Sequence, residues 1–102
     1  LAADNDYVYF IRLGDNQILR VGKNGGGATL VASGLSYPRQ LVVDDQFVFF
    51  TEMNDAYVGQ VRKAGGSTLV RYEGEHVLAI AQHDGILYFS STENIGIYAM
   101  VK

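Results

Sequence analysis

Short apolar runs separated by polar turns recur along the chain, and no segment has the apolar spacing of an amphipathic helix. One set begins with Leu41–Val43 and is ended by Asp44–Gln46, where Asp side chains can bond their own backbone and close a tight turn. The next run, 47–51, is apolar almost throughout, which indicates a strand buried on both faces. A mixed run over 57–62 and a more polar one over 67–72 follow. This pattern predicts four short β-strands.

The same set of runs recurs at an interval of about 40 residues. The matching segments are Tyr7–Phe10 with Phe47–Phe50, Ile18–Val21 with Val58–Val61, and Gly25-Gly26 with Gly65-Gly66, while a third copy starts at Ile80. The glycine pairs can take the positive φ that a hairpin turn needs. We expect one structural unit over 1–40, a second over 41–79, and a third, lacking its outer strand, over 80–102.

A four-stranded antiparallel sheet whose inner strands are buried on both faces needs a neighbouring sheet on each side. Repetition of such a sheet about an axis gives a β-propeller, with one blade per repeat. A β-sandwich would normally show alternating inward and outward residues instead of continuous apolar blocks. The expected fold class is therefore all-β, built from β-propeller blades that are four-stranded antiparallel sheets.

The repeat resembles those of the six-bladed propellers of the YWTD, NHL and TolB-like group. Residues 38–44 (PRQLVVD), 47–52 (FVFFTE) and 58–61 (VGQV) stand where those families carry PxxIAVD, VYWTD and IxRV. The resemblance covers the whole chain and implies about half of a six-bladed propeller. The chain departs from the pattern in having no Trp, with Phe10, Phe50 and Phe89 at that position, which favours a divergent relative.

Three blades do not close a ring, and an open ring leaves two apolar faces exposed. Two explanations fit this pattern. Either the remaining blades belong to a longer chain, or two copies associate about a two-fold axis to give six blades.

Composition narrows the class of protein further. The chain is 48% hydrophobic with seven Tyr and five Phe, enough for a packed core, and its net charge of −3 with scattered Lys and Arg argues against a nucleic-acid partner. No apolar run approaches the ~20 residues of a membrane span. The absence of cysteine excludes disulfides and thiolate metal sites. The chain begins at Leu1, so we expect that an upstream segment was removed, and an extracellular or periplasmic location is favoured.

Candidate recognition residues lie in the loops that join the second strand to the third, and the fourth strand to the next blade. In propellers these loops share one end of the molecule, and here they vary between copies, as recognition loops do. The candidates for ligand or partner contact are Arg12, Tyr37, Arg39, Glu52 and His76. Each also has a plain structural reading as a solvated or loop-bracing side chain.

No catalytic signature is present: the Gly-x-Ser-x-Gly motif is absent, and the two histidines, His76 and His83, are expected at opposite ends of one strand, roughly 20 Å apart. We therefore expect no catalytic residue, metal site or cofactor. The predicted function is a non-catalytic binding or scaffolding module for a protein, peptide or glycan. The alternative, which the resemblance allows, is part of a metal-dependent hydrolase, lactonase or lyase whose active site is completed by other blades or a second chain.

Overall fold

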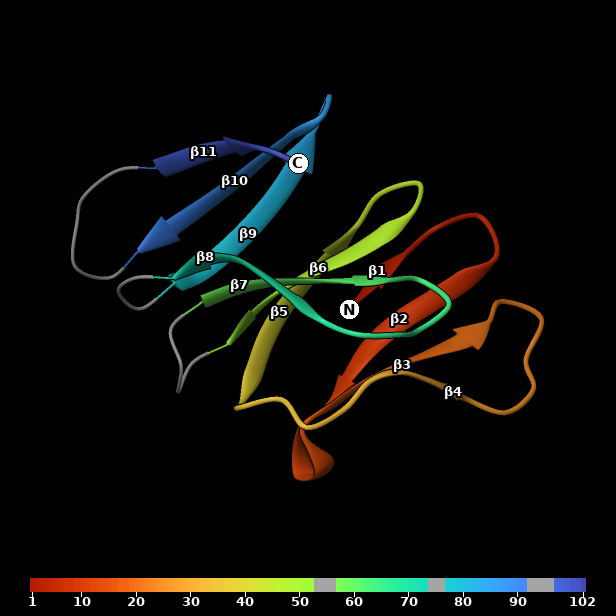
Figure 1. Ribbon diagram of the computed structural model, residues 1–102. Helices are drawn as coiled ribbons and strands as arrows, with labels where there is room; N and C mark the ends of the chain where they lie inside the picture. Colours follow the sequence, from red (N-terminus) through yellow and green to blue (C-terminus); the bar gives the residue numbers. More distant parts are fainter. Residues whose placement is uncertain (53–56, 74–76, 92–96) are drawn as a thin grey trace.

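The computed structural model describes residues 1–52, 57–73, 77–91 and 97–102 (Figure 1). Within these ranges the chain is almost entirely β-structure, with one short 3-10 helix, η1 (Leu13–Asp15). The strands are β1 (Ala2–Ala3), β2 (Tyr7–Arg12), β3 (Gln17–Gly22), β4 (Thr29–Ala32), β5 (Pro38–Val43), β6 (Phe47–Glu52), β7 (Tyr57–Arg62), β8 (Leu69–Glu73), β9 (Val77–His83), β10 (Ile86–Ser91) and β11 (Ile97–Val101).

The strands form three antiparallel sheets, in which strands that are consecutive in the chain pair with each other. The first sheet contains β1 to β4, the middle sheet β5 to β8, and the third sheet β9 to β11. The all-β class and the expected strand numbers of four, four and three are thus confirmed. The strands β5 and β9 begin at Pro38 and Val77, earlier than the divisions expected at residues 41 and 80.

The glycine pairs of the β3–β4 and β7–β8 connections have the backbone conformation expected of them. Gly25 and Gly26 have φ of 96° and 98°, and Gly65 and Gly66 have φ of 99° and 136°. These values lie in the region that side chains with a Cβ rarely adopt, so the recurrence of the two glycines follows from turn geometry.

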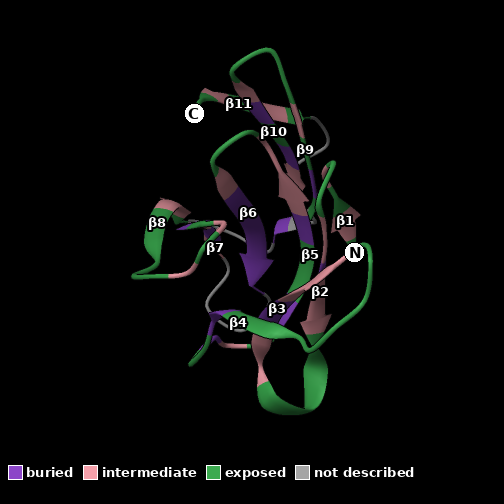
Figure 2. Ribbon diagram, turned by 90° about the vertical axis from the view of Figure 1, so that its right-hand side faces the viewer, coloured by how far each residue is buried: buried purple, intermediate pink, exposed green. Residues whose placement is uncertain are grey.

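The middle sheet is covered on both faces by the other two sheets. Val48 and Phe50 pack in one apolar cluster with residues of the first sheet, whereas Phe49 packs in a second cluster with residues of the third sheet. Consecutive residues of a strand point to opposite faces, so this division follows from the pleat. Figure 2 shows β6 as a buried strand between its neighbours. The prediction that residues 47–51 are buried on both faces is confirmed for residues 48–51, while Phe47 is partly exposed.

The corresponding strands of the outer sheets are covered on one face only. In β10, Leu87 and Phe89 are buried, but Tyr88 between them is 37% exposed. In β2, Tyr9 is buried while Val8 and Phe10 are partly exposed. These strands differ from β6 because each outer sheet has one neighbouring sheet in the described structure and not two.

The Phe50 ring fills its space by lying directly over a glycine of the adjacent strand. Phe50 is paired with Gly59, and a Cβ atom at Gly59 would lie 2.3 Å from the Phe50 ring. The ring also meets Tyr57 edge-on, with 6.3 Å between the ring centroids. Gly59 is therefore needed for close approach.

We expect Phe50→Ala to lower the free energy of unfolding by about 3–5 kcal/mol, because it removes a fully buried ring and leaves a cavity. Denaturant titration followed by circular dichroism measures this loss. Leu13→Ala, at an exposed position in η1, is the control and should change stability by less than about 0.5 kcal/mol. A loss below about 1 kcal/mol for Phe50→Ala would contradict the assigned packing.

Candidate functional site

An ionic contact ties the first sheet to the middle sheet at the turn that follows β1. One oxygen of Asp4, Oδ2, accepts hydrogen bonds from the Lys63 ammonium at 2.8 Å and from the Tyr9 hydroxyl at 3.0 Å. The other, Oδ1, accepts the backbone N–H groups of Asp6 and Tyr7 at 2.9 and 2.8 Å. The carboxylate thus closes its own turn and holds the next sheet at the same time.

The same contact recurs between the middle and third sheets. Asp44 Oδ1 accepts the backbone N–H groups of Gln46 and Phe47 at 2.8 and 2.7 Å, and Oδ2 lies 3.2 Å from the Lys102 ammonium. Lys102 also donates to the side-chain oxygen of Gln82. An Asp in the turn after one sheet's first strand therefore pairs with a Lys after the third strand of the next sheet.

These contacts displace the pKa values of both carboxyl groups. Burial raises the pKa of Asp4, but the hydrogen bonds from Lys63, the two backbone N–H groups and Tyr9 outweigh it, so the pKa lies well below its ordinary value. Burial likewise raises the pKa of Asp44, and the backbone and Lys102 contacts lower it further than burial raises it. The pKa of the Tyr9 hydroxyl is raised, first by burial and then by its hydrogen bond to Asp4.

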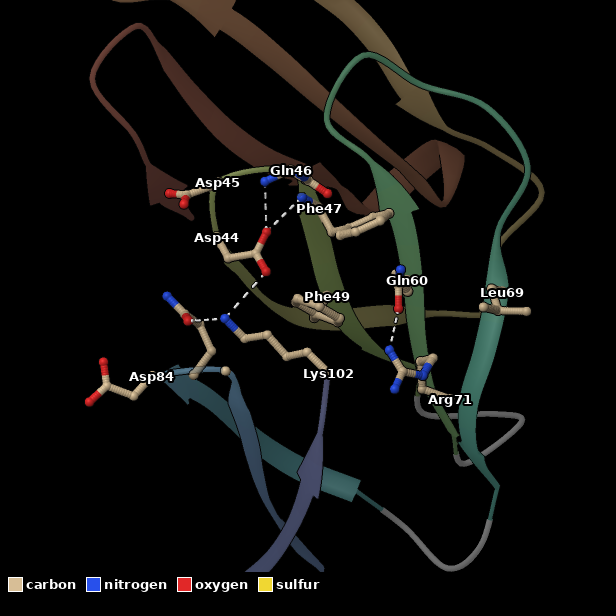
Figure 3. A pocket seen from close by; sticks show the side chains of 12 residues that line it. Asp44, Asp45, Gln46, Phe47, Phe49, Gln60, Leu69, Arg71, Asp84 and Lys102 are labelled. Carbon is tan, nitrogen blue, oxygen red and sulfur yellow. Dashed lines mark hydrogen bonds and ion pairs between the residues drawn. The ribbon is translucent and has the colours of Figure 1, made fainter.

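A hollow of about 840 Å³ lies beside the second of these contacts, between the middle and third sheets (Figure 3). Its lining residues are Asp44, Asp45, Gln46, Phe47, Phe49, Gln60, Leu69, Arg71, Gln82, Asp84, Gly85 and Lys102. Arg71 donates to the Gln60 side chain and to the Val101 carbonyl. Asp45 and Asp84 point away from the Asp44–Lys102 pair. The cations of the hollow are thus engaged in holding strands together, and they form no array aimed at a ligand.

The opposite end of the middle sheet brings together three of the candidate residues. Pro38 is the pairing partner of Glu52, so Tyr37 and Arg39, on either side of Pro38, lie beside the end of β6. The register shifts between Pro38 and Gln40, which places Arg39 in a β-bulge. Tyr37 is 49% exposed and has a φ of 65°, an uncommon value for a residue with a side chain. Strained backbone of this kind clusters at binding sites.

Glu52 is the most unusual residue of this group. Its side chain alternates with those of Val48 and Phe50 and so lies on the face that packs against the first sheet. The residue is 1% exposed, and neither carboxylate oxygen has a hydrogen-bond partner within the described part of the chain. Burying an uncompensated carboxylate costs several kcal/mol. Such a group in a native structure calls for an explanation.

The other two candidates are placed differently. Arg12 ends β2, is exposed, and forms an ion pair with Asp15 of its own loop at 2.9 Å. This loop meets the one before β5, where the Leu35 N–H donates to the Asn16 carbonyl at 3.4 Å. His76 lies outside the described residues.

The described residues contain no group of three or more His, Cys, Asp or Glu arranged to hold a metal ion. No described helix is both long and apolar enough to cross a membrane.

The Asp–Lys contacts lie outside the candidate set chosen from the sequence, although their spacing signals them. Lys23, Lys63 and Lys102 occupy one position of the repeat, and Asp4 and Asp44 occupy another. That these two positions meet across sheets depends on how one sheet stacks on the next, which the spacing does not contain.

A comparison with protein-family models finds no match for this chain, and a comparison with curated proteins finds none either. The functional proposal therefore rests on the geometry described above.

We expect the free energy of unfolding to fall as the pH drops below about 4, the ordinary carboxyl pKa. A carboxyl group whose pKa is lowered by folding stabilises the folded state above its unfolded pKa, and this contribution is lost on acidification. Asp4→Asn should lower stability at pH 7 by about 1.5–3 kcal/mol, the range for a hydrogen bond to a charged group, and should flatten the acid dependence.

Chemical denaturation at a series of pH values measures both effects. Asp45→Asn is the matched control, because Asp45 is exposed in the equivalent turn of the middle sheet. Equal behaviour of the two variants would show that the Asp4–Lys63 contact does not stabilise the fold.

Proposed function

We propose that this chain is a non-catalytic binding module of the β-propeller type. It recognises a cationic group of a protein or peptide at the end of the middle sheet where Tyr37, Arg39 and Glu52 lie. The three consecutive antiparallel sheets and the sequence repeat support the propeller assignment. The observation that carries the functional part is the buried carboxylate of Glu52, which has no hydrogen-bond donor among the residues described.

A cation is the partner that this carboxylate lacks. A Lys ammonium or an Arg guanidinium supplies both charge and hydrogen bonds to a carboxylate, and such charge-assisted bonds are about twice as strong as neutral ones. Tyr37 adds an exposed aromatic ring at the start of the adjacent strand, and aromatic faces attract cations. Both oxygens of Glu52 are covered in the free chain, so binding is coupled to a local rearrangement at this end.

The alternative function, part of a metal-dependent hydrolase, lactonase or lyase, needs several convergent oxygen or nitrogen ligands. Glu52 belongs to no group of three or more His, Cys, Asp or Glu residues that could hold a metal ion among the described residues. A peptide-binding role needs the single carboxylate only, and it is the role that we propose.

Glu52→Gln should abolish capture of a Lys-containing peptide and at the same time raise stability. The amide keeps the size of the side chain but removes the buried charge, so we expect at least a tenfold loss of affinity and a gain of about 1–3 kcal/mol in the free energy of unfolding. Biosensor measurements with an array of short peptides carrying a central Lys, Arg or norleucine, combined with thermal melting, provide both readouts.

Glu73→Gln is the matched control, since Glu73 is an exposed carboxylate at the same end of the middle sheet. It should leave affinity and stability nearly unchanged. Equal binding of the Lys and norleucine peptides to the wild-type chain would overturn the proposal, as would destabilisation by Glu52→Gln, which would assign Glu52 a structural role.

A further inference from the structure

The outer face of the third sheet carries residues at repeat positions that are buried elsewhere in the molecule. Tyr88 stands at the position of Phe49, which is fully buried, yet Tyr88 is 37% exposed. Ile97 stands at the position of Val58, which is also fully buried, yet Ile97 is 75% exposed. In the middle sheet this face meets the next sheet along the chain. The third sheet thus presents a sheet-packing face that nothing covers within the described chain.

The outer face of the first sheet carries the opposite half of the same contact. Val8 and Phe10 stand at the positions of Val48 and Phe50, which are buried against the preceding sheet. Val8 faces Val21 and Phe10 faces Leu19 on the paired strand, so the apolar side chains form one continuous patch. Val8 and Phe10 are partly exposed where their counterparts are fully buried.

We propose that these two faces bind each other between two copies of this chain, with the third sheet of each copy packed on the first sheet of the other. The contact would repeat the packing that already joins consecutive sheets within one chain. It joins two different faces, so two copies related by a two-fold axis form it twice and close a ring of six sheets. The chain measures 42 × 31 × 20 Å, and a longest extent about twice the shortest is the proportion of half a disc.

A hollow on the third sheet fits this arrangement. It has a volume of about 160 Å³ and is lined by Ala79, Ala81, Tyr88 and Ile97 among others. An apolar cavity of about 150 Å³ accommodates a benzene molecule. Phe10 of the second copy, at the position from which Phe50 meets the first sheet, is the aromatic ring that would fill the hollow.

The Asp–Lys contact of consecutive sheets is not available between the two outer faces. Each sheet that follows another contributes a Lys to the Asp of its predecessor, as Lys63 does to Asp4 and Lys102 to Asp44. Lys23 occupies this position in the first sheet and is exposed. The third sheet carries His83 at the position of Asp4 and Asp44, and Asp84 follows at the position of Asp45, where its exposed carboxylate lies 3.2 Å from His83. The contact between two copies therefore rests on apolar packing and not on a third Asp–Lys pair.

The mass of the chain in solution, measured by light scattering across a concentration series, gives the first readout. We expect twice the chain mass of 11.2 kDa. A monomer at all concentrations would overturn the proposal, as would open-ended polymers, because a ring of two copies leaves no face free. Either result would mean that another occupant, such as further sheets of a longer chain, covers the faces.

Two charge variants distinguish this head-to-tail pairing from a symmetric contact of one face with itself. Ile97→Lys, on the third sheet, and Phe10→Glu, on the first sheet, should each halve the mass, since each variant disrupts both contacts of the ring. Mixing the two should restore the dimer, because one contact is then wild type and the other pairs Lys with Glu. Restoration also shows that both variants fold.

Val8→Glu replaces Phe10→Glu if the latter fails to fold, and Leu13→Lys, at an exposed position in η1, is the control that should remain dimeric. If each folded variant is monomeric and their mixture stays monomeric, the pairing is not head-to-tail and the proposal fails. Glu52→Gln is expected to remain dimeric, so loss of peptide capture and loss of assembly are separate outcomes.

Discussion

Phe49 and Phe50 are consecutive residues of β6 whose side chains leave opposite faces of the middle sheet, and both are fully buried. A strand with apolar side chains on both faces is stable only between two other layers, because each exposed face would lose the free energy of apolar burial. The stacking of three sheets in chain order follows from this constraint. The two outer sheets obey the same constraint only in part, and their uncovered faces are the origin of the proposed assembly.

Apolar burial drives this stacking but does not by itself set how one sheet lies on the next, since it is not directional. The Asp4–Lys63 and Asp44–Lys102 contacts are directional, and each begins from an Asp that already fixes its own turn. The turn holds the carboxylate rigidly, so the Lys of the following sheet meets an acceptor in a defined place. One residue type at one repeat position thereby serves both the local turn and the stacking.

Glu52 differs from Asp4 and Asp44, because no described residue donates a hydrogen bond to its buried carboxylate. Glu52 lies on the same face of its sheet as Val48 and Phe50. At the equivalent position of the first sheet, Arg12 is exposed and forms an ion pair. A buried carboxylate without a hydrogen-bond donor among the described residues is a local conflict in an otherwise consistent sequence, and the proposal made for Glu52 rests on it.

The sequence by itself determined the strand order, the turns and the strand count of each sheet, because apolar runs, Asp turns and glycine pairs are local signals read within a few residues. It placed Glu52 among the predicted recognition residues as part of the loop after the run 47–51, whereas Glu52 is the last residue of β6. Only the tertiary structure decided which apolar blocks are buried on both faces, since the difference between Phe49 and Tyr88 lies in the presence of a neighbouring sheet and not in the residues themselves. The same holds for Lys63 and Lys102, whose partners lie in another sheet. It also holds for Glu52, because the absence of a hydrogen-bond partner among the described residues depends on what packs over its side chain.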